Sequence, residues 1–178
     1  AEARQAQEMA WEYAGTEINL QSPKQLQKVL FEDMGLKPTK RTKSGSYTTN
    51  AAALQDLYVK SVDNERANGF LGALLRHREI NKLKQIVQTL IDATNTSDER
   101  IHTTFEQTVA ATGRLSSVDP NLQNIPNRNA AGREIRGVFV PGEGYEALMS
   151  CDYSQVELRI MADLSDDEAL IEAFRSGA

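Results

Sequence analysis

The spacing of apolar residues changes at Asn95-Thr96-Ser97, and this change limits the folds open to the chain. Before it, apolar residues recur every three or four positions, which is typical of amphipathic helices. We predict helices over 1–14, from Ser22 to Gly35, over 51–60 and over about 67–93. The second has a start signal in Ser22-Pro23 with Gln25 three residues after the serine, and Gly35 is a stop signal. Residues 1–97 are therefore predicted to be all-helical.

After this point the pattern favours strands. Apolar and polar residues alternate over 101–107, and a long polar stretch follows over 108–133. Residues 135–140 and 145–151 each have strand composition, and the turn sequence at 141–144 predicts that they form a hairpin. Helical spacing returns from Ser154, and a short helix is predicted over 166–175. The expected fold class is α+β: a helical region, then part of an antiparallel sheet that ends in a helix.

Composition excludes several classes of protein. Hydrophobic residues make up 40% of the 178 residues and charged residues 25%, unlike a disordered tail. No run approaches the ~20 apolar residues that span a bilayer. The single cysteine, Cys151, excludes a disulfide framework and suits a reducing cytoplasm. The chain opens and stops beside helical stretches, without an initiator methionine, so we expect it to be part of a longer cytoplasmic protein.

Charge is distributed unevenly. Residues 1–97 carry 13 Lys and Arg against 11 Asp and Glu, whereas residues 98–178 carry 7 against 14. Four basic residues fall within 37–43 without an acid. A basic loop and an acidic end could hold a polyanion at one place and metal cations at another. The alternative is that both are ordinary solvated surfaces.

The junction at 151–159 places a carboxylate, Asp152, between a predicted strand and a predicted helix. Such a carboxylate can hold Mg²⁺, which binds one or two carboxylates together with waters and substrate phosphates. Alternatively, Asp152 interacts with the helix dipole. Ser154 and Glu157 have the spacing of a capping box, which offers a structural explanation for Glu157.

The polar segment 111–126 is rich in Arg, Asn, Gln and Ser. These side chains can reach the minor-groove acceptors present on every correctly paired base pair, and also phosphates. Such a surface could test pairing geometry without reading sequence. The alternative is a polar loop whose Asn and Pro residues form turns.

Two motifs carry a family resemblance. DYSQVELR at 152–159 resembles the first catalytic motif of the family A DNA polymerases, the bacterial DNA polymerase I group, and TGRLSS-x-DPNLQNIP at 112–126 resembles the segment that precedes it. The intervening GREIRGVF fits as well. The resemblance covers the whole chain and implies that 1–97 is most of the thumb and 98–178 the first part of the palm, without the fingers or the rest of the palm.

The resemblance also implies roles for single residues. Asp152 would be one of two palm aspartates that hold a pair of Mg²⁺ ions, with the Tyr153 carbonyl as a further ligand. Glu157 would be a steric gate against a ribose 2′-hydroxyl, and Gln155 would contact the nascent base pair. Residues that would contact the primer-terminal duplex are Arg114, Asn121, Gln123, Asn124 and Arg128. Residues of the thumb-tip loop that would grip the DNA backbone are Lys40, Arg41, Lys43 and Ser44.

The implied activity is template-directed DNA synthesis in replication or repair, with primer-template DNA and deoxynucleoside triphosphates as partners. The implied location is the bacterial cytoplasm, at the nucleoid. One departure is Asp163, where close relatives usually have His. Because the second metal aspartate and the nucleotide-binding helix lie outside the sequence, we expect this chain alone to be duplex-binding and inactive. The resemblance also implies a monomeric polymerase. Two alternatives stay open: a single-subunit RNA polymerase, against which Glu157 argues, and a nucleic-acid-binding module without catalysis.

Overall fold

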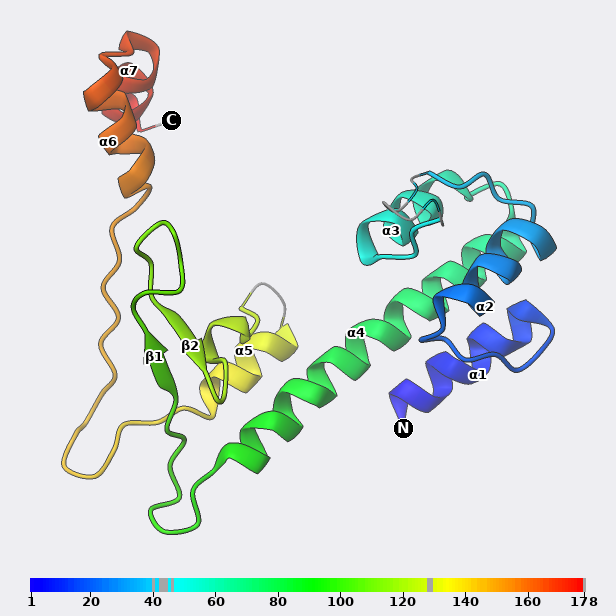
Figure 1. Cartoon of the computed structure of the whole chain (residues 1–178), viewed down its shortest axis with the longest axis horizontal. Helices are drawn as coiled ribbons and strands as arrows, with labels where there is room; N and C mark the ends of the chain where they lie inside the picture. Colours follow the sequence, from blue (N-terminus) through cyan, green and yellow to red (C-terminus); the bar gives the residue numbers. More distant parts are fainter. Residues whose placement is uncertain (40, 42–44, 46, 128–129, 178) are drawn as a thin grey trace. The chain divides into compact units, whose positions relative to one another are not determined.

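The computed structural model describes residues 1–39, 41, 45, 47–127 and 130–177, and it divides into two compact units (Figure 1). The first unit comprises Ala1–Arg136 and the second Gly137–Ala178. The first contains 18 Lys and Arg against 16 Asp and Glu, and the second contains 2 against 9. The excess of acidic residues at the end of the sequence therefore lies in the second unit.

The helices predicted for the first half are confirmed. They are α1 (Glu2–Ala14), α2 (Pro23–Gln27), which continues as the π-helical segment η1 (Lys28–Asp33), α3 (Ala51–Lys60) and α4 (Glu65–Ala93). Ser22 caps α2 by accepting a hydrogen bond from the Gln25 amide. The Gln25 side chain accepts from the backbone N–H of Asn19 at 2.7 Å and not from that of Ser22. The Ser22 bond of the predicted capping box therefore forms, and the Gln25 bond goes to a different backbone group. Asn50 and Asn64 cap α3 and α4 in the same way as Ser22 caps α2.

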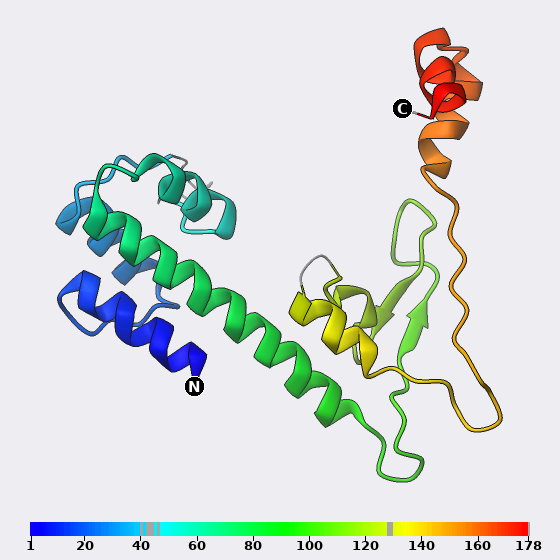
Figure 2. The same ribbon diagram turned by 180° about the vertical axis from the view of Figure 1, so that it is seen from behind.

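The hydrophobic core lies where α1, α2 and α3 pack around the N-terminal half of α4 (Figure 2). Phe70, Leu71 and Leu74 of α4 are fully buried there. Each such side chain contributes about 1.5–3 kcal/mol by burial. Helices α1 and α4 approach closely because Gly69 has no Cβ, and a Cβ at this position would overlap the Tyr13 ring.

The C-terminal half of α4 extends past this core. The helical spacing of apolar residues over 67–93 forms a stripe that includes Val87, Leu90 and Ile91. Leu90 is buried, but Val87 and Ile91 are exposed. The stripe therefore predicts the helix correctly and its burial only in part.

A small antiparallel sheet follows α4. Strand β1 (Thr104–Glu106) pairs with β2 (Ser116–Val118), with Phe105 opposite Ser117. The 101–107 strand prediction is confirmed in part, whereas β2 lies in a stretch that was predicted to be a polar loop. After β2 come the 3₁₀ turn η2 (Leu122–Asn124) and helix α5 (Ala130–Gly137).

The predicted strand over 135–140 is wrong, because α5 occupies its first residues. The predicted partner strand over 145–151 is also wrong, since residues 138–155 form no strand or helix. Strand propensity depends on packing partners, and an isolated hairpin is marginal in water. The 145–151 segment has no such partner among the described residues: Leu148 and Met149 are 66% and 89% exposed.

The second unit ends in two helices, α6 (Val156–Ser165) and α7 (Glu168–Ser176), as the sequence predicts. Helices with one short antiparallel sheet make the fold class α+β, and that prediction is confirmed. Among the described residues, none of the helices has the length and apolar content needed to cross a membrane.

Candidate nucleic-acid interface

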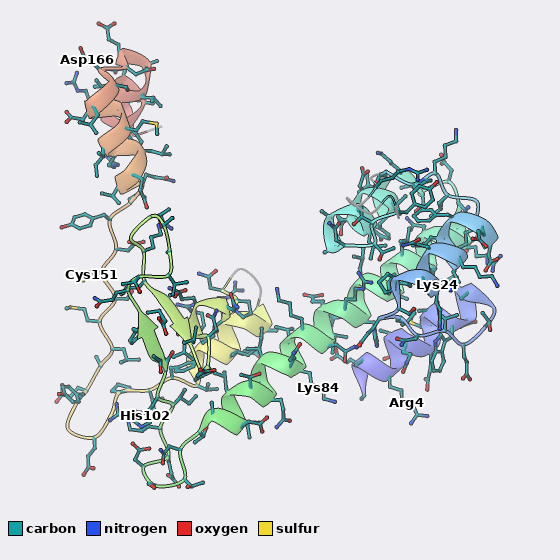
Figure 3. The ribbon with its side chains drawn as sticks, in the orientation of Figure 1. Arg4, Lys24, Lys84, His102, Cys151 and Asp166 are labelled. Carbon is teal, nitrogen blue, oxygen red and sulfur yellow. The ribbon has the colours of Figure 1, made fainter. Side chains whose placement is uncertain are left out.

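Two adjacent hollows lie along the C-terminal half of α4, and we call them together the α4 groove. The first encloses about 570 Å³ and is lined by Gln21, His77, Arg78, Asn81, Lys82, Lys84, Gln85 and Gln88. The second encloses about 440 Å³ and is lined by Lys82, Gln85, Ile86, Thr89, Leu90, Asn121, Asn124 and Ile125. Lys82 and Gln85 line both hollows. Figure 3 shows Lys84 projecting from the same helix.

The α4 groove is lined by residues that were predicted to contact nucleic acid and by residues for which no role was predicted. Asn121 and Asn124 were predicted to contact nucleic acid, and they lie beside Lys82 and Gln85 of α4. Positions 78, 82 and 85 share one face of a helix. This spacing of basic and amide side chains was the available signal. It was weak, because exposed charges on a helix are usually solvated.

Arg78 and His77 form the partly buried floor of the first hollow. Nη1 of Arg78 donates to the Thr49 carbonyl oxygen at 2.6 Å, and burial lowers the pKa of Arg78. Burial, and secondarily the charge of Arg78, lower the pKa of His77. The Asn81 amide nitrogen lies 2.9 Å from Nε2 of His77. If Nε2 accepts this bond, the proton of the neutral ring is on Nδ1, which is buried and has no partner among the described residues.

The side-chain amides of Asn121 and Gln123 are held by hydrogen bonds within their own loop. Oδ1 of Asn121 accepts from the Gln123 backbone amide at 2.9 Å, and Nε2 of Gln123 donates to the Leu115 carbonyl at 2.9 Å. Each side-chain amide nitrogen carries two hydrogens, so within the part of the chain that the structure describes Gln123 keeps a second N–H donor and Asn121 keeps both. Asn121, Gln123, Asn124 and Arg114 are all exposed, and amide N–H groups suit minor-groove acceptors.

In the predicted thumb-tip loop, Arg41 is fixed by its neighbours. Its guanidinium lies 4.5 Å from the centre of the Tyr47 ring and donates to the Tyr47 hydroxyl and the Gly45 carbonyl, each at 2.9 Å. The Tyr47 ring in turn meets Phe31 edge-on at 5.1 Å. A guanidinium has five N–H donors, so these two bonds leave capacity for a phosphate. The other residues predicted at the DNA, Lys40, Lys43, Ser44 and Arg128, lie outside the described residues.

Asp152 lies in the second unit, on the extended segment before α6 where Figure 3 labels Cys151. Asp152 and Tyr153 are exposed. The N-cap of α6 is Gln155, with φ 55°, so the predicted start at Ser154 is wrong and Glu157 occupies the second helical position. Nε of Arg159 donates to the Ser154 carbonyl at 2.9 Å, and its guanidinium lies 4.6 Å from the centre of the Phe174 ring. This arginine ties the junction to α6 and α7.

The Asp152 carboxylate and the Tyr153 carbonyl are oxygen donors of the kind that Mg²⁺ prefers. They supply only part of a ligand set. Within the described ranges, no group of three or more His, Cys, Asp or Glu residues could hold a metal ion. The residues present thus fit one side of a magnesium site, and the described chain does not complete a two-metal site.

The similarity of this chain to known proteins extends along its whole sequence. The sequence model of DNA polymerase family A matches residues 1–178. The chain belongs to DNA polymerase family A. It is 58% identical over 174 residues to DNA polymerase I of Mycobacterium tuberculosis and 43% identical over 175 residues to that of Bacillus subtilis; each alignment covers 98% of this chain. The alignments cover 18% and 19% of those two relatives, so the chain spans about a fifth of their length.

A solved structure has the same fold as this chain. The POL domain of Pol1 from M. smegmatis, in complex with DNA primer-template and dNTP, matches with a TM-score of 0.90 and 56% sequence identity. The match covers 99% of this chain and 30% of that one. Family membership confirms the resemblance carried by the 112–126 and 152–159 motifs. The roles that it implies for single residues stay predictions.

Proposed function

We propose that this chain is the duplex-gripping and first metal-binding part of a DNA-directed DNA polymerase. The full-length protein would extend a primer along a template by transferring a nucleotidyl group from a deoxynucleoside triphosphate to the primer 3′-hydroxyl. The observation that carries the proposal is the family match along all 178 residues, which includes both motifs. The structure with a TM-score of 0.90 is of a polymerase domain with DNA primer-template and dNTP.

The roles that we propose for the two regions of the chain are those that the family resemblance implies. Residues 1–97 would form most of the thumb and 98–178 the first part of the palm. In the thumb, Lys40, Arg41, Lys43 and Ser44 would contact the duplex backbone. Sequence-independent contacts of this kind suit an enzyme that must move along any template.

The α4 groove supports a second set of duplex contacts. Asn121 and Asn124, with Gln123 and Arg114, would donate hydrogen bonds to minor-groove acceptors, and Arg128 would contact the same duplex. Lys82 lines the same hollow as Asn121 and Asn124, and it would neutralise a phosphate. Acceptors at these positions occur on every Watson–Crick pair, so the contacts would report correct pairing and not sequence.

In the palm, the Asp152 carboxylate and the Tyr153 carbonyl would hold Mg²⁺. When bound, the metal lowers the pKa of the primer hydroxyl and neutralises phosphate charge. Glu157 would occupy the space of a ribose 2′-hydroxyl, and Gln155 would contact the nascent pair. Because the described residues give only one side of the metal site, the 178-residue chain alone would bind duplex without extending primers. The full-length polymerase would be a monomer.

Primer extension by the full-length protein tests the proposal. Replacing Asp152 with alanine should abolish extension while the Kd for primer-template stays within about twofold. Asp163→Ala is the matched control, because it removes another exposed carboxylate of the second unit, from α6. Normal extension by Asp152→Ala would overturn the assignment of the metal ligand. A wild-type protein that binds primer-template and never extends it would instead be a nucleic-acid-binding module.

A further inference from the structure

Two hydroxyl groups form hydrogen bonds with the backbone of the loop that carries the side-chain amides of Asn121, Gln123 and Asn124. Oγ1 of Thr103, just before β1, lies 2.6 Å from Oγ of Ser117 in β2. It also lies 2.9 Å from the Pro120 carbonyl oxygen and 3.0 Å from that of Val118. The Leu122 backbone amide donates to Oγ of Ser117 at 3.1 Å. Ser117 is only 1% exposed, although it lies in a serine- and asparagine-rich stretch.

The short contacts fit one directed chain of hydrogen bonds. Each hydroxyl has one proton to donate. If Leu122 N–H donates to Ser117, Ser117 donates to Thr103 and Thr103 donates to the Pro120 carbonyl, every proton is used once. Chains that run in one direction strengthen each bond by polarisation. The Val118 carbonyl and the longer 3.3 Å contact from Ser117 to Pro120 are alternative acceptors for the same protons.

The ends of this chain fall on the two sides of Asn121. Its last acceptor is the carbonyl of Pro120, and its first donor is the amide of Leu122. The hydroxyl pair therefore fixes the backbone immediately before and after Asn121, as well as the first residue of η2, which carries Gln123 and Asn124. None of these three amides contacts Thr103 or Ser117 through its own side chain among the hydrogen bonds of the described residues.

We propose that Thr103 and Ser117 are positioning residues for polymerisation: they hold Asn121, Gln123 and Asn124 at the minor groove of the primer-terminal base pair. This inference rests on the proposed function. A correctly paired terminus places its acceptors where fixed amides reach them, and a mismatch displaces them. Loosening the loop should therefore slow the extension of a matched terminus more than that of a mismatched one.

The primary test is Ser117→Ala in the full-length polymerase, with Ser116→Ala as the matched control. Ser116 is adjacent on β2, and its buried Oγ has no hydrogen-bond partner in the described structure. The readout is the kcat/KM for extending a matched primer terminus divided by that for a mismatched one. We expect Ser117→Ala to lower this ratio about tenfold, which corresponds to about 1.4 kcal/mol, and Ser116→Ala to change it less than twofold. A merely structural role would lower the melting temperature and leave the ratio unchanged.

Thr103 provides a second pair of variants should Ser117→Ala fold poorly. Thr103→Ser keeps the hydroxyl and should keep the ratio, whereas Thr103→Val keeps the shape and should lower it. Equal ratios in these two variants would overturn the inference.

A double-mutant cycle separates this inference from the proposed function. If Ser117 acts through the loop, adding Ser117→Ala to Asn124→Ala should lower the ratio little further. Full additivity would overturn the positioning role while leaving the amide contacts in place. If Asn121→Ala and Asn124→Ala both leave the ratio and the DNA affinity unchanged, the proposed minor-groove function of the loop is what fails.

Discussion

Replacing Lys82 with alanine in the full-length protein removes one positive charge from the centre of the α4 groove. Lys82 lines both hollows, next to Asn121 and Asn124 on one side and Arg78 on the other. Among the described residues, no carboxylate forms an ion pair with it. If the groove receives the duplex, its ammonium group is available to displace a condensed counterion from one phosphate.

The expected effect follows from counterion release. Neutralising one phosphate contributes about −0.9 to the slope of log Kobs against log salt concentration. Lys82→Ala should therefore flatten the slope by about 0.9. Between about 50 and about 200 mM salt, the affinity advantage of the wild type over the variant should shrink by about 3.5-fold. The loss should be similar for unrelated duplex sequences, because a phosphate contact carries no base information.

Fluorescence anisotropy with a labelled primer-template, titrated at several salt concentrations, gives both slopes. Lys60→Ala is the control: this α3 lysine is already paired with Asp56 at 2.9 Å, and it lines neither hollow. An unchanged slope in Lys82→Ala would remove Lys82 from the interface. Equal flattening by Lys60→Ala would show that general charge, and not the groove, is responsible.

Two further predictions concern Glu157 and His77. In the full-length enzyme, Glu157→Ala should raise ribonucleotide incorporation relative to deoxynucleotide incorporation. A 10²-fold change in this ratio is equivalent to about 2.7 kcal/mol at the transition state. A lower melting temperature at an unchanged ratio of kcat/KM values would mean that Glu157 is only structural. Because burial lowers the pKa of His77, the unfolded state takes up a proton more readily, so the free energy of unfolding should decrease as pH falls below the ordinary histidine value of 6.5. Urea titrations between about pH 7.5 and 5 should show a smaller decrease in the free energy of unfolding for His77→Gln than for the wild type, with His102→Gln as the exposed control. Identical pH profiles for His77→Gln and the wild type would contradict this role of His77.

The helices of the first half could be predicted because their signals are local. Ser22, Asn50 and Asn64 each accept a hydrogen bond from a backbone amide three residues later, which a short stretch of sequence can reveal. Apolar spacing then indicates which face is buried. It does not indicate how far along a helix the burial extends, since Val87 and Ile91 follow the pattern of Leu71 and Leu74 and yet are exposed.

Strand pairing is not local, and the hairpin predicted over 135–151 is wrong. Residues 145–151 have strand composition, but a strand needs a partner, and the first half of the predicted partner over 135–140 belongs to helix α5. The Ala, Arg and Glu residues of 130–136 favour a helix wherever no neighbouring strand competes. In contrast, β2 pairs with β1 through Ser116–Val118, a segment whose polar side chains gave no strand signal.

The candidate site was predictable to the extent that motifs carry it. The 112–126 and 152–159 motifs indicated the amide loop and Asp152, and family membership supports both. Lys82 and Gln85 were missed because only the fold shows that the C-terminal half of α4 lies beside Asn121 and Asn124. A basic residue on an exposed helix face is informative only when the surface opposite it is known.

Ser117 shows why the polar loop could not be interpreted from composition. A serine among Asn, Pro and Asp residues is normally taken to be a solvent-exposed turn former, and this one is 1% exposed with its hydroxyl bonded to Thr103 and Leu122. A buried hydroxyl is costly unless it is paired, so such a position tolerates few residues other than serine or threonine. The loop thus combines a hydrogen-bonded hydroxyl pair, which fixes its backbone, with exposed side-chain amides, which would contact the duplex.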